Sequence, residues 1–250
     1  MRIENETKKN QGVPTKSSDF MGHIPISEIF YSIQGEGKYA GHPSVFVRVG
    51  GCNLKCPGFG EKGCDSYYAV DKSYKSEWKL MNVEEIKSEV SKYLNKNTHL
   101  VITGGEPTLF YKQLYPLVEW FKGQITIETN TTVDINFEKY PAYKKAAFAM
   151  SVKLSNSGEE YTKRVKKGII ASYVKNAPKS FFKFVIDRDL NDEIKEITGE
   201  TNAAVYCMPL GADREELEKN APFVFGFCLK HGYCYSDRIH IRLFGKKKGV

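Results

Sequence analysis

The sequence predicts an α/β protein whose parallel strands curl into a partial, incomplete β/α barrel of about six β-α units. From Ile24 onward, segments of apolar alternation take turns with segments of helical period, and this order is typical of repeated β-α units. The 250 residues hold fewer units than a closed barrel needs. We therefore expect a single domain over residues 23–250, preceded by a disordered polar extension over residues 1–22.

Each element is assigned from its residue pattern. Ser27–Gln34 and Ser44–Val49 are predicted strands, because apolar residues recur through both segments. Val83–Leu94 is a predicted helix, since Asn82 is a suitable N-cap and Glu85 can complete a capping box. The same patterns predict further helices at Leu109–Phe121, Phe137–Lys145, Glu159–Lys166, Asn191–Ile197 and Arg214–His231, and further strands at His99–Thr103, Gln124–Glu128, Ala146–Val152, Phe181–Ile186, Ala203–Met208 and Arg238–Phe244.

Unusual loops follow several of these strands. They begin after Val49, Thr103, Glu128, Val152 and Met208. In parallel α/β folds the ligand site lies at the carboxyl ends of the strands. We therefore expect these loops to form one site.

Composition and charge exclude several classes of protein. Hydrophobic residues make up 41% and charged residues 27%, as in ordinary folded proteins. The net charge of +7 comes largely from two short runs, Lys163–Lys167 and Lys246–Lys248, which indicate solvated surface more often than a nucleic-acid site. Met1–Asp19 is polar, and no segment approaches the roughly 18 apolar residues of a membrane span. We expect a soluble cytoplasmic protein with reduced thiols that binds neither nucleic acid nor membrane.

The six cysteines form two groups. Cys52, Cys56 and Cys64 are close together, and a structural zinc ion would need a fourth ligand, for which His42 and His99 are the nearest candidates. Three thiolates can instead hold a [4Fe–4S] cluster and leave one iron open to a small molecule. Spacing alone leaves cluster, zinc and chance open. The scattered cysteines are predicted to be core residues: Cys207, Cys228 and Cys234.

A second motif favours the cluster. Leu100–Pro107 is a predicted strand that runs into two glycines, an acid and a proline, and glycines let a ligand approach the backbone closely. By itself such a turn is common in β-α connections. A Cys-x3-Cys loop after one strand and Gly-Gly-Glu-Pro after the next together resemble the radical S-adenosylmethionine (SAM) superfamily. This resemblance implies that the open iron binds SAM and that the Gly-Gly-Glu turn holds the SAM amino group.

Four further segments narrow the resemblance. They are Ser27–Gly37, Gly41–Arg48, Ile127–Asn130 and Ile239–Gly245, and together they resemble the 7-carboxy-7-deazaguanine synthase (QueE) family from about Ile24 to Val250. The resemblance implies the radical SAM type of partial barrel and a carbon–nitrogen lyase of 7-deazapurine, queuosine-type biosynthesis. Such an enzyme converts 6-carboxy-5,6,7,8-tetrahydropterin to 7-carboxy-7-deazaguanine with loss of ammonia and depends on Mg²⁺.

The resemblance also implies roles for residues of this sequence. Cys52, Cys56 and Cys64 would hold the [4Fe–4S] cluster, and Ser66 would bind Mg²⁺. The expected SAM contacts are Gly105, Glu106, Ser151, Val152, Lys153, Met208, Pro209, Leu210 and Gly211. The expected substrate contacts are Ile33, Gln34, Gly35, Arg48, Thr103, Glu128, His240 on the terminal strand, and the chain end at Val250. No protein residue is expected to act as a catalytic acid or base, because SAM carries the radical.

The chemistry of three substrate contacts supports these roles. A cationic Arg48 can pair with the substrate carboxylate, and Gln34 and Glu128 can read the amide and amine edge of a pterin. Two departures from the family pattern concern the cluster loop. Seven residues separate Cys56 from Cys64 where the family usually has two, and Ser66 replaces a threonine whose hydroxyl it can match.

The resemblance further implies a homodimer that takes electrons from a flavodoxin- or ferredoxin-type protein. Two other functions are open at this point. A glycyl-radical-enzyme activase of the same superfamily would also have the cysteines and the Gly-Gly-Glu-Pro turn, but not Gln34–Gly37. A non-catalytic domain in which zinc staples the cysteine loop would need no SAM.

Overall fold

Within the part of the chain that the structure describes, nine strands form one sheet in the order β3-β1-β2-β4-β5-β6-β7-β8-β9. The computed structural model describes residues 22–59, 63–199, 201–247 and 249–250. Apart from Gly22, the predicted N-terminal extension lies outside the described residues, and so does the segment 60–62 of the cysteine loop.

The strands are β1 (Ile24–Ile33), β2 (Pro43–Val49), β3 (Lys79–Met81), β4 (His99–Gly104), β5 (Ile125–Thr129), β6 (Ala147–Met150), β7 (Phe181–Ile186), β8 (Val205–Pro209) and β9 (Cys234–Tyr235). The α-helices are α1 (Tyr67–Val70), α2 (Val83–Ser91), α3 (Tyr111–Trp120), α4 (Tyr161–Arg164), α5 (Lys167–Asn176), α6 (Asn191–Thr198), α7 (Arg214–His231) and α8 (Ile239–Phe244). Short 3-10 turns are η1 (Gly37–Tyr39), η2 (Pro57–Phe59), η3 (Lys72–Glu77), η4 (Pro107–Phe110), η5 (Pro141–Lys145) and η6 (Ser155–Ser157).

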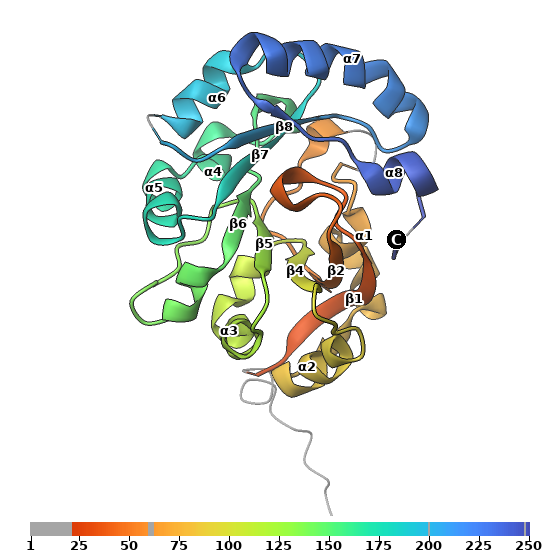
Figure 1. Ribbon diagram of the computed structural model, residues 1–250, viewed down its shortest axis with the longest axis vertical. Coiled ribbons are helices and arrows are strands. Elements are labelled where there is room, and N and C mark those ends of the chain that lie inside the picture. Colours follow the sequence, from red (N-terminus) through yellow and green to blue (C-terminus); the bar gives the residue numbers. More distant parts are fainter. Residues whose placement is uncertain (1–21, 60–62, 200, 248) are drawn as a thin grey trace, which may run out of the picture.

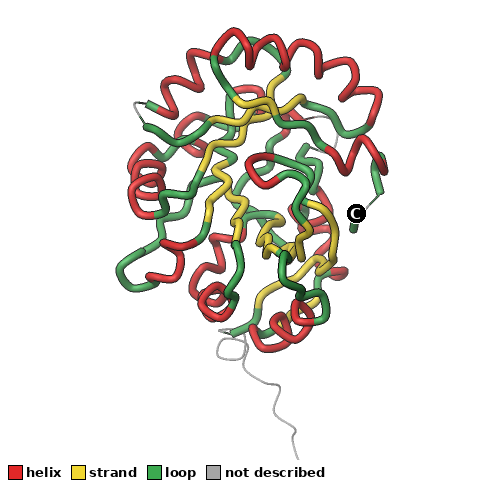
Figure 2. Tube along the Cα trace, in the orientation of Figure 1, coloured by secondary structure: helices red, strands yellow, loops and turns green. Residues whose placement is uncertain are grey.

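The sheet is mostly parallel. β1 pairs antiparallel with β2 and β3, and every pairing from β2 to β9 is parallel. The strands follow a curve, and α3, α5, α6 and α7 lie along its outer side (Figure 1); the tube in Figure 2 shows the same curve in yellow. The predicted α/β class is confirmed, whereas the count of about six units and the partial-barrel description stay predictions.

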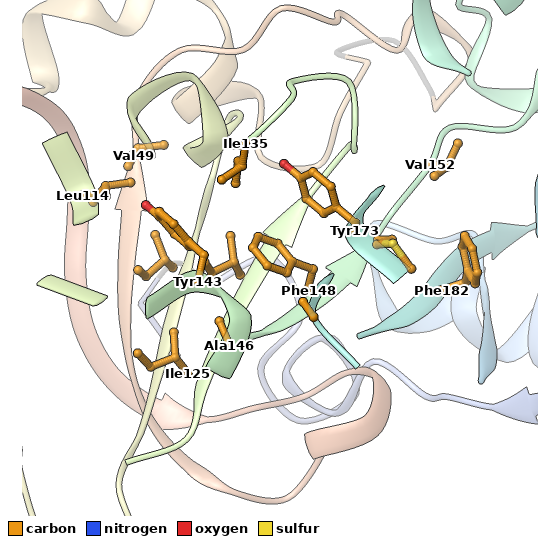
Figure 3. Close-up of a cluster of buried hydrophobic side chains, with 14 of the residues drawn as sticks. Val49, Leu114, Ile125, Ile135, Tyr143, Ala146, Phe148, Val152, Tyr173 and Phe182 are labelled. Atoms are coloured by element: carbon orange, nitrogen blue, oxygen red, sulfur yellow. The ribbon is translucent and has the colours of Figure 1, made fainter. Parts of the chain in front are cut away.

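The core lies between the sheet and these outer helices, and aromatic side chains fill much of it (Figure 3). The rings of Phe148 and Tyr173 have centroids 4.6 Å apart. The buried hydroxyls of Tyr143 and Tyr173 donate hydrogen bonds to the carbonyls of Tyr111 and Val133, at 2.7 and 2.8 Å. Aromatic residues therefore fill the core without leaving their polar atoms unpaired.

The predicted start of α2 is confirmed in detail. The Asn82 side chain accepts hydrogen bonds from the amides of Glu84 and Glu85, both at 3.0 Å. In return, the amide of Asn82 donates to the Glu85 carboxylate at 2.8 Å. This reciprocal pair is a capping box, which satisfies amides that the first helical turn leaves free.

The predicted terminal strand Arg238–Phe244 is wrong, because this segment forms helix α8. Its amides bond mainly within the segment: Arg242 donates to the carbonyl of Arg238 and Gly245 to that of Ile241. A run this short satisfies both the strand and the helix pattern, so periodicity cannot distinguish them. The edge of the sheet beside β8 is taken instead by β9, two residues long.

Other differences concern short or irregular elements. The predicted helix over Glu159–Lys166 ends early in α4, because Val165 has an extended backbone with φ −113° and ψ 114°. An unpredicted helix, α5, then begins after Lys166. Strands β3 and β9 were also not predicted. Cys207 and Cys228 are buried as expected, but Cys234 is exposed on the edge strand, so its prediction as a core residue is wrong.

Candidate active site

The three cysteines lie on the loop that follows β2. The Cys52 thiol accepts a hydrogen bond from the amide of Leu54 at 3.4 Å, and Cys56 has a left-handed backbone with φ 53°. The carboxylate of Glu159 accepts from the amides of Lys55 and Cys56, at 2.5 and 2.8 Å. Glu159 thereby anchors the loop to the segment between β6 and α4.

The three thiols share one neighbouring cation. Burial raises the pKa of Cys52 to about 11 and that of Cys64 to about 12, and it also raises the pKa of Cys56. The ammonium group of Lys153 opposes the shift at all three thiols. Thiols in this environment become thiolates at neutral pH when a cationic metal centre binds them. Three thiols that share one neighbouring cation are chemically suited to be the ligands of a [4Fe–4S] cluster.

The candidate fourth ligands for a zinc ion do not lie beside the cysteine loop. Within residues 22–59, 63–199, 201–247 and 249–250, no group of three His, Cys, Asp or Glu side chains, the three cysteines included, is arranged to hold a metal ion. The proposed fourth ligands are also misplaced, because His42 precedes β2 and His99 begins β4, at the amino ends of the strands. The cysteine loop follows the carboxyl end of β2, on the opposite side of the fold.

The Gly-Gly-Glu-Pro turn packs directly on the start of the cysteine loop. Gly104 has φ 126°, and a Cβ atom there would lie 2.2 Å from the carbonyl oxygen of Val49. A Cβ atom on Gly105 would lie 2.0 Å from the carbonyl oxygen of Gly51. The amides of Gly105 and Glu106 donate to these same carbonyls at 3.0 and 2.8 Å. The two glycines are therefore required for this contact between the loops.

Glu106 is fully buried and its carboxylate is held by the protein. It accepts hydrogen bonds from the amide of Thr108 at 3.0 Å, the hydroxyl of Thr129 at 2.8 Å and the amide of Asn130 at 2.6 Å. Burial raises the pKa of Glu106, and these hydrogen bonds oppose the shift. The side chain thus ties the turn after β4 to the end of β5.

Four predicted substrate contacts meet on the inner face of the sheet. Arg48 of β2 is the register partner of Thr103 of β4. The hydroxyl of Thr103 donates to the Glu128 carboxylate at 2.7 Å, and the side-chain amide of Gln34 donates to the same carboxylate at 3.4 Å. Residues that are 94 positions apart in the chain therefore form one polar group.

Arg48 links this group to the cysteine loop. Its Nε donates to Glu28 at 2.7 Å, and its Nη1 donates to the Ser66 hydroxyl at 3.2 Å. Its guanidinium carbon lies 5.8 Å and 5.7 Å from the ring centroids of Phe30 and Tyr68. The pairing with Glu28 was not predicted.

Sequence reasoning also missed four charged residues beside this group. Lys183 of β7 donates to Glu36 at 2.8 Å and to Glu128 at 3.0 Å. Arg238 donates through Nε to Glu36 at 2.8 Å and through Nη2 to Asp65. Lys183 had a signal in the sequence, since it is a charged residue inside an otherwise apolar strand.

Two carboxylates of this network, those of Glu36 and Asp65, are held in the ionised form. Burial alone would raise the pKa of Glu36, but Lys183, Arg238 and His240 outweigh it and hold that pKa well below its usual range. Burial would also raise the pKa of Asp65, and Arg238 lowers it to about 2. The inner face therefore presents fixed charges of both signs.

Comparison with known proteins identifies the family. A family profile described as "4Fe-4S single cluster domain" matches residues 33–165. A 7-carboxy-7-deazaguanine synthase from Rhodopirellula baltica is 34% identical over 243 residues, which cover 90% of this chain and 88% of the relative. The chain belongs to the 7-carboxy-7-deazaguanine synthase family. The prediction of a radical SAM lyase is thereby confirmed, and the family implies an iron–sulfur cluster and SAM as cofactors.

Further 7-carboxy-7-deazaguanine synthases agree with this assignment. The one from Halobacterium salinarum is 32% identical over 242 residues, which cover 88% of this chain and 90% of the relative. The crystal structure of QueE from Escherichia coli has a TM-score of 0.66 at 20% identity, covering 90% of this chain and all of that one, and it supports the fold. These relatives do not favour the activase or the zinc-stapled domain. No helix in the described parts of the chain is long and apolar enough to span a membrane.

The SAM contacts expected from the synthase family lie at the ends of β6 and β8. After β6, the Lys153 ammonium donates to the Ser151 hydroxyl at 3.1 Å, and the Val152 side chain is buried in the core. Met208 and Pro209 end β8, and the amide of Leu210 donates to the carbonyl of Ile186 at 3.0 Å. Gly211, the last of these contacts, supplies a carbonyl to Arg238.

The remaining substrate contacts expected for the family are spread over three segments. Ile33 ends β1 and is partly exposed. His240 lies on α8 against Gly35, where an added Cβ atom would meet the His240 Nδ1 at 2.5 Å. The chain end at Val250 follows Gly249, whose Cβ position would be 3.9 Å from the Glu28 carboxylate. Two surface hollows of about 490 and 460 Å³ lie elsewhere and are lined by none of the predicted site residues.

Proposed function

We propose that the chain converts 6-carboxy-5,6,7,8-tetrahydropterin to 7-carboxy-7-deazaguanine with loss of ammonia, in a reaction that depends on Mg²⁺. One observation carries this proposal: Gln34, Arg48, Thr103 and Glu128 meet on the inner face of the sheet beside the cysteine loop. A carboxypterin presents an anionic carboxylate and a ring edge of amide and amine groups. In this polar group, Arg48 is a cation that can pair with the substrate carboxylate. The amide of Gln34 and the carboxylate of Glu128 can bind the ring edge.

The roles of these residues follow from their neighbours. Glu128 is held from two sides by Thr103 and Lys183, so its carboxylate has a fixed direction and accepts from ring N–H groups. Arg48 is half-buried beside aromatic rings and is always charged, so it pairs with the substrate carboxylate. The residues bind and orient the pterin and exclude water from it.

The cofactors would be held by the loops at the strand ends. Cys52, Cys56 and Cys64 would bind the cluster. The SAM contacts would come from the turns after β4, β6 and β8, namely Gly105, Glu106, Ser151, Val152, Lys153, Met208, Pro209, Leu210 and Gly211. When bound, cluster and SAM supply the radical that removes a hydrogen atom from the substrate. Glu106 has its carboxylate engaged within the protein, and it shapes the turn that would receive the SAM amino group.

We place the Mg²⁺ site at Ser66. Its hydroxyl lies 3.4 Å from the Asp65 carboxylate and 3.2 Å from Arg48, so an oxygen-seeking cation there would adjoin the proposed carboxylate site. We further propose, from the family alone, a homodimer in the cytoplasm that takes electrons from a flavodoxin- or ferredoxin-type protein and serves queuosine-type biosynthesis.

Turnover by the anaerobically reconstituted enzyme tests this function. Incubation with SAM, a reductant, Mg²⁺ and the carboxypterin should yield 7-carboxy-7-deazaguanine, detected by mass spectrometry. Arg48→Ala should lower turnover of the pterin far more than it lowers SAM affinity, because Arg48 faces the substrate. Arg188→Ala is the matched control, since Arg188 forms an exposed pair with Asp187. Lack of product from the unmodified enzyme, or equal loss of pterin turnover and SAM affinity in Arg48→Ala, would contradict the proposal.

A further inference from the structure

We propose that Arg238 is a positioning residue that joins the cysteine loop, the loop after β1 and the turn after β8 into one site. Its effect on the pterin rests on the function proposed above, whereas its effect on SAM rests only on family membership. Arg238 is not among the residues that the family resemblance assigned.

Three donor groups of Arg238 reach three different loops. Nε donates to the Glu36 carboxylate at 2.8 Å, and Nη1 donates to the carbonyl of Gly211 at 2.6 Å. Nη2 donates to the Asp65 carboxylate, next to Cys64. The Arg238 side chain is only 6% exposed, so water does not replace these contacts. Hydrogen bonds between charged groups are short and strong in such surroundings.

Each partner belongs to a segment with its own proposed ligand. Asp65 stands between Cys64 and Ser66, so its position affects both the cluster loop and the Mg²⁺ site. Glu36 follows Gln34 and Gly35 and also binds Lys183. Lys183 in turn binds Glu128, which belongs to the proposed substrate contacts. Gly211 ends the turn that we assign to SAM. One guanidinium group therefore sets the relative positions of the three ligand sites.

The backbone around Arg238 supports the same connection. The amide of Ser236 donates to the carbonyl of Cys207 in β8 at 2.9 Å, and its hydroxyl accepts from the amide of Gly37 at 2.7 Å. The amide of Ile239 donates to the carbonyl of Gly35 at 3.1 Å. Segment 236–240 thus spans from β8 to the loop after β1, and Arg238 lies at its centre.

Lysine cannot reproduce this arrangement. Guanidinium is planar and carries donors that point in fixed, separate directions, whereas an ammonium group is a single point of charge on a flexible chain. Arg238→Lys keeps the charge but loses the simultaneous contacts. A merely structural arginine would show its effect in thermal stability, whereas a positioning residue changes binding and turnover.

The test uses the reconstituted holoenzyme with Arg238→Lys, Arg238→Ala and the control Arg242→Lys. Arg242 lies one helical turn beyond Arg238 in α8, and its side chain pairs with Asp237, which directly precedes Arg238. The measurements are iron and sulfide content, the change that SAM causes in the electron paramagnetic resonance spectrum of the reduced cluster, the KM values for SAM and pterin, and kcat. Millimolar guanidinium is then added to Arg238→Ala.

We expect Arg238→Lys to keep its iron content, to lose about 100-fold in kcat, and to raise both KM values. The SAM-induced spectral change should be weaker in this variant, and guanidinium should restore part of the activity of Arg238→Ala. Unchanged KM values, a change in only one of them, or no rescue would overturn the proposal. So would failure of both variants to fold or to hold iron, since Arg238 would then act on folding. The spectral measurement needs no pterin, so an enzyme that binds SAM normally but makes no deazaguanine contradicts only the proposed function.

Discussion

Replacing Lys183 with methionine removes the ammonium group that two buried carboxylates share. The Nζ atom lies 2.8 Å from Glu36 and 3.0 Å from Glu128, and the Lys183 side chain is 6% exposed. Methionine has a similar length and fills the same volume, so the substitution removes charge without opening a cavity. Glu36 retains Arg238 as a partner, and Glu128 retains Thr103.

Removal of one partner from a buried ion pair costs about 3–5 kcal/mol, because the remaining charge is left uncompensated. This loss is a large part of the roughly 5–15 kcal/mol by which domains are stable. For a chain of this size it corresponds to a fall in Tm of about 6–20 °C. Because Glu36 still binds Arg238 and Glu128 still binds Thr103, we expect the loss of stability and the fall in Tm to lie in the lower half of these ranges.

The loss should depend on pH in a defined direction. Since the pKa of Glu36 in the folded protein is well below its ordinary value of 4.5, the charged form stabilises the fold above that value, and the contribution disappears as pH falls through the folded pKa. Without Lys183 this contribution is smaller. The stability difference between the unmodified protein and Lys183→Met should therefore stay constant between about pH 7.5 and about pH 4.5, and it should shrink as the pH is lowered from about 4.5 toward the folded pKa of Glu36.

Urea unfolding of the protein, followed by circular dichroism under anaerobic conditions, measures this difference at about pH 7.5 and at about pH 3.5, which is below the ordinary pKa of Glu36. Lys179→Met is the matched control, because Lys179 is exposed and contacts Gln124 near the start of the same strand. A loss below about 1 kcal/mol at the higher pH, or the same loss at both, would refute the reasoning about the buried carboxylates.

Three further outcomes are expected. Cys64→Ser should abolish the brown colour of the cluster and turnover after reconstitution, and full activity would remove Cys64 from the ligand set. Gly105→Ala should lower the free energy of unfolding by about 1–3 kcal/mol, because the added methyl group clashes with Gly51. The control Gly168→Ala should not lower it, because Gly168 has open space around it. Equal effects of the two variants in urea unfolding would contradict the close approach of Gly105 to Gly51. Asn82→Ala should cost about 1 kcal/mol in the same assay through loss of the capping box, and an unchanged midpoint would argue against it.

Local patterns predicted the elements that a short stretch of chain specifies. Asn82 begins a helix because the partners of its cap lie within three residues, and β4 ends in glycines that meet the cysteine loop. The segment after Arg238 was mispredicted, because six apolar and polar residues fit a strand as well as a helix. Only the surrounding chain, with β9 already at the sheet edge, makes it helical.

The sequence alone determined the α/β class, the family, and the loops on which the candidate site residues lie, because these depend on residue types at short, fixed spacings. The ion network on the inner face was decided only by the tertiary structure. Lys183 meets Glu36 across 147 positions, Arg238 meets Glu36 across 202, and Arg238 meets Asp65 across 173. Local spacing carries no information about which buried cation will face which carboxylate. That choice depends on how the curved sheet brings its strand ends together, and it makes Arg238 a shared contact of three loops.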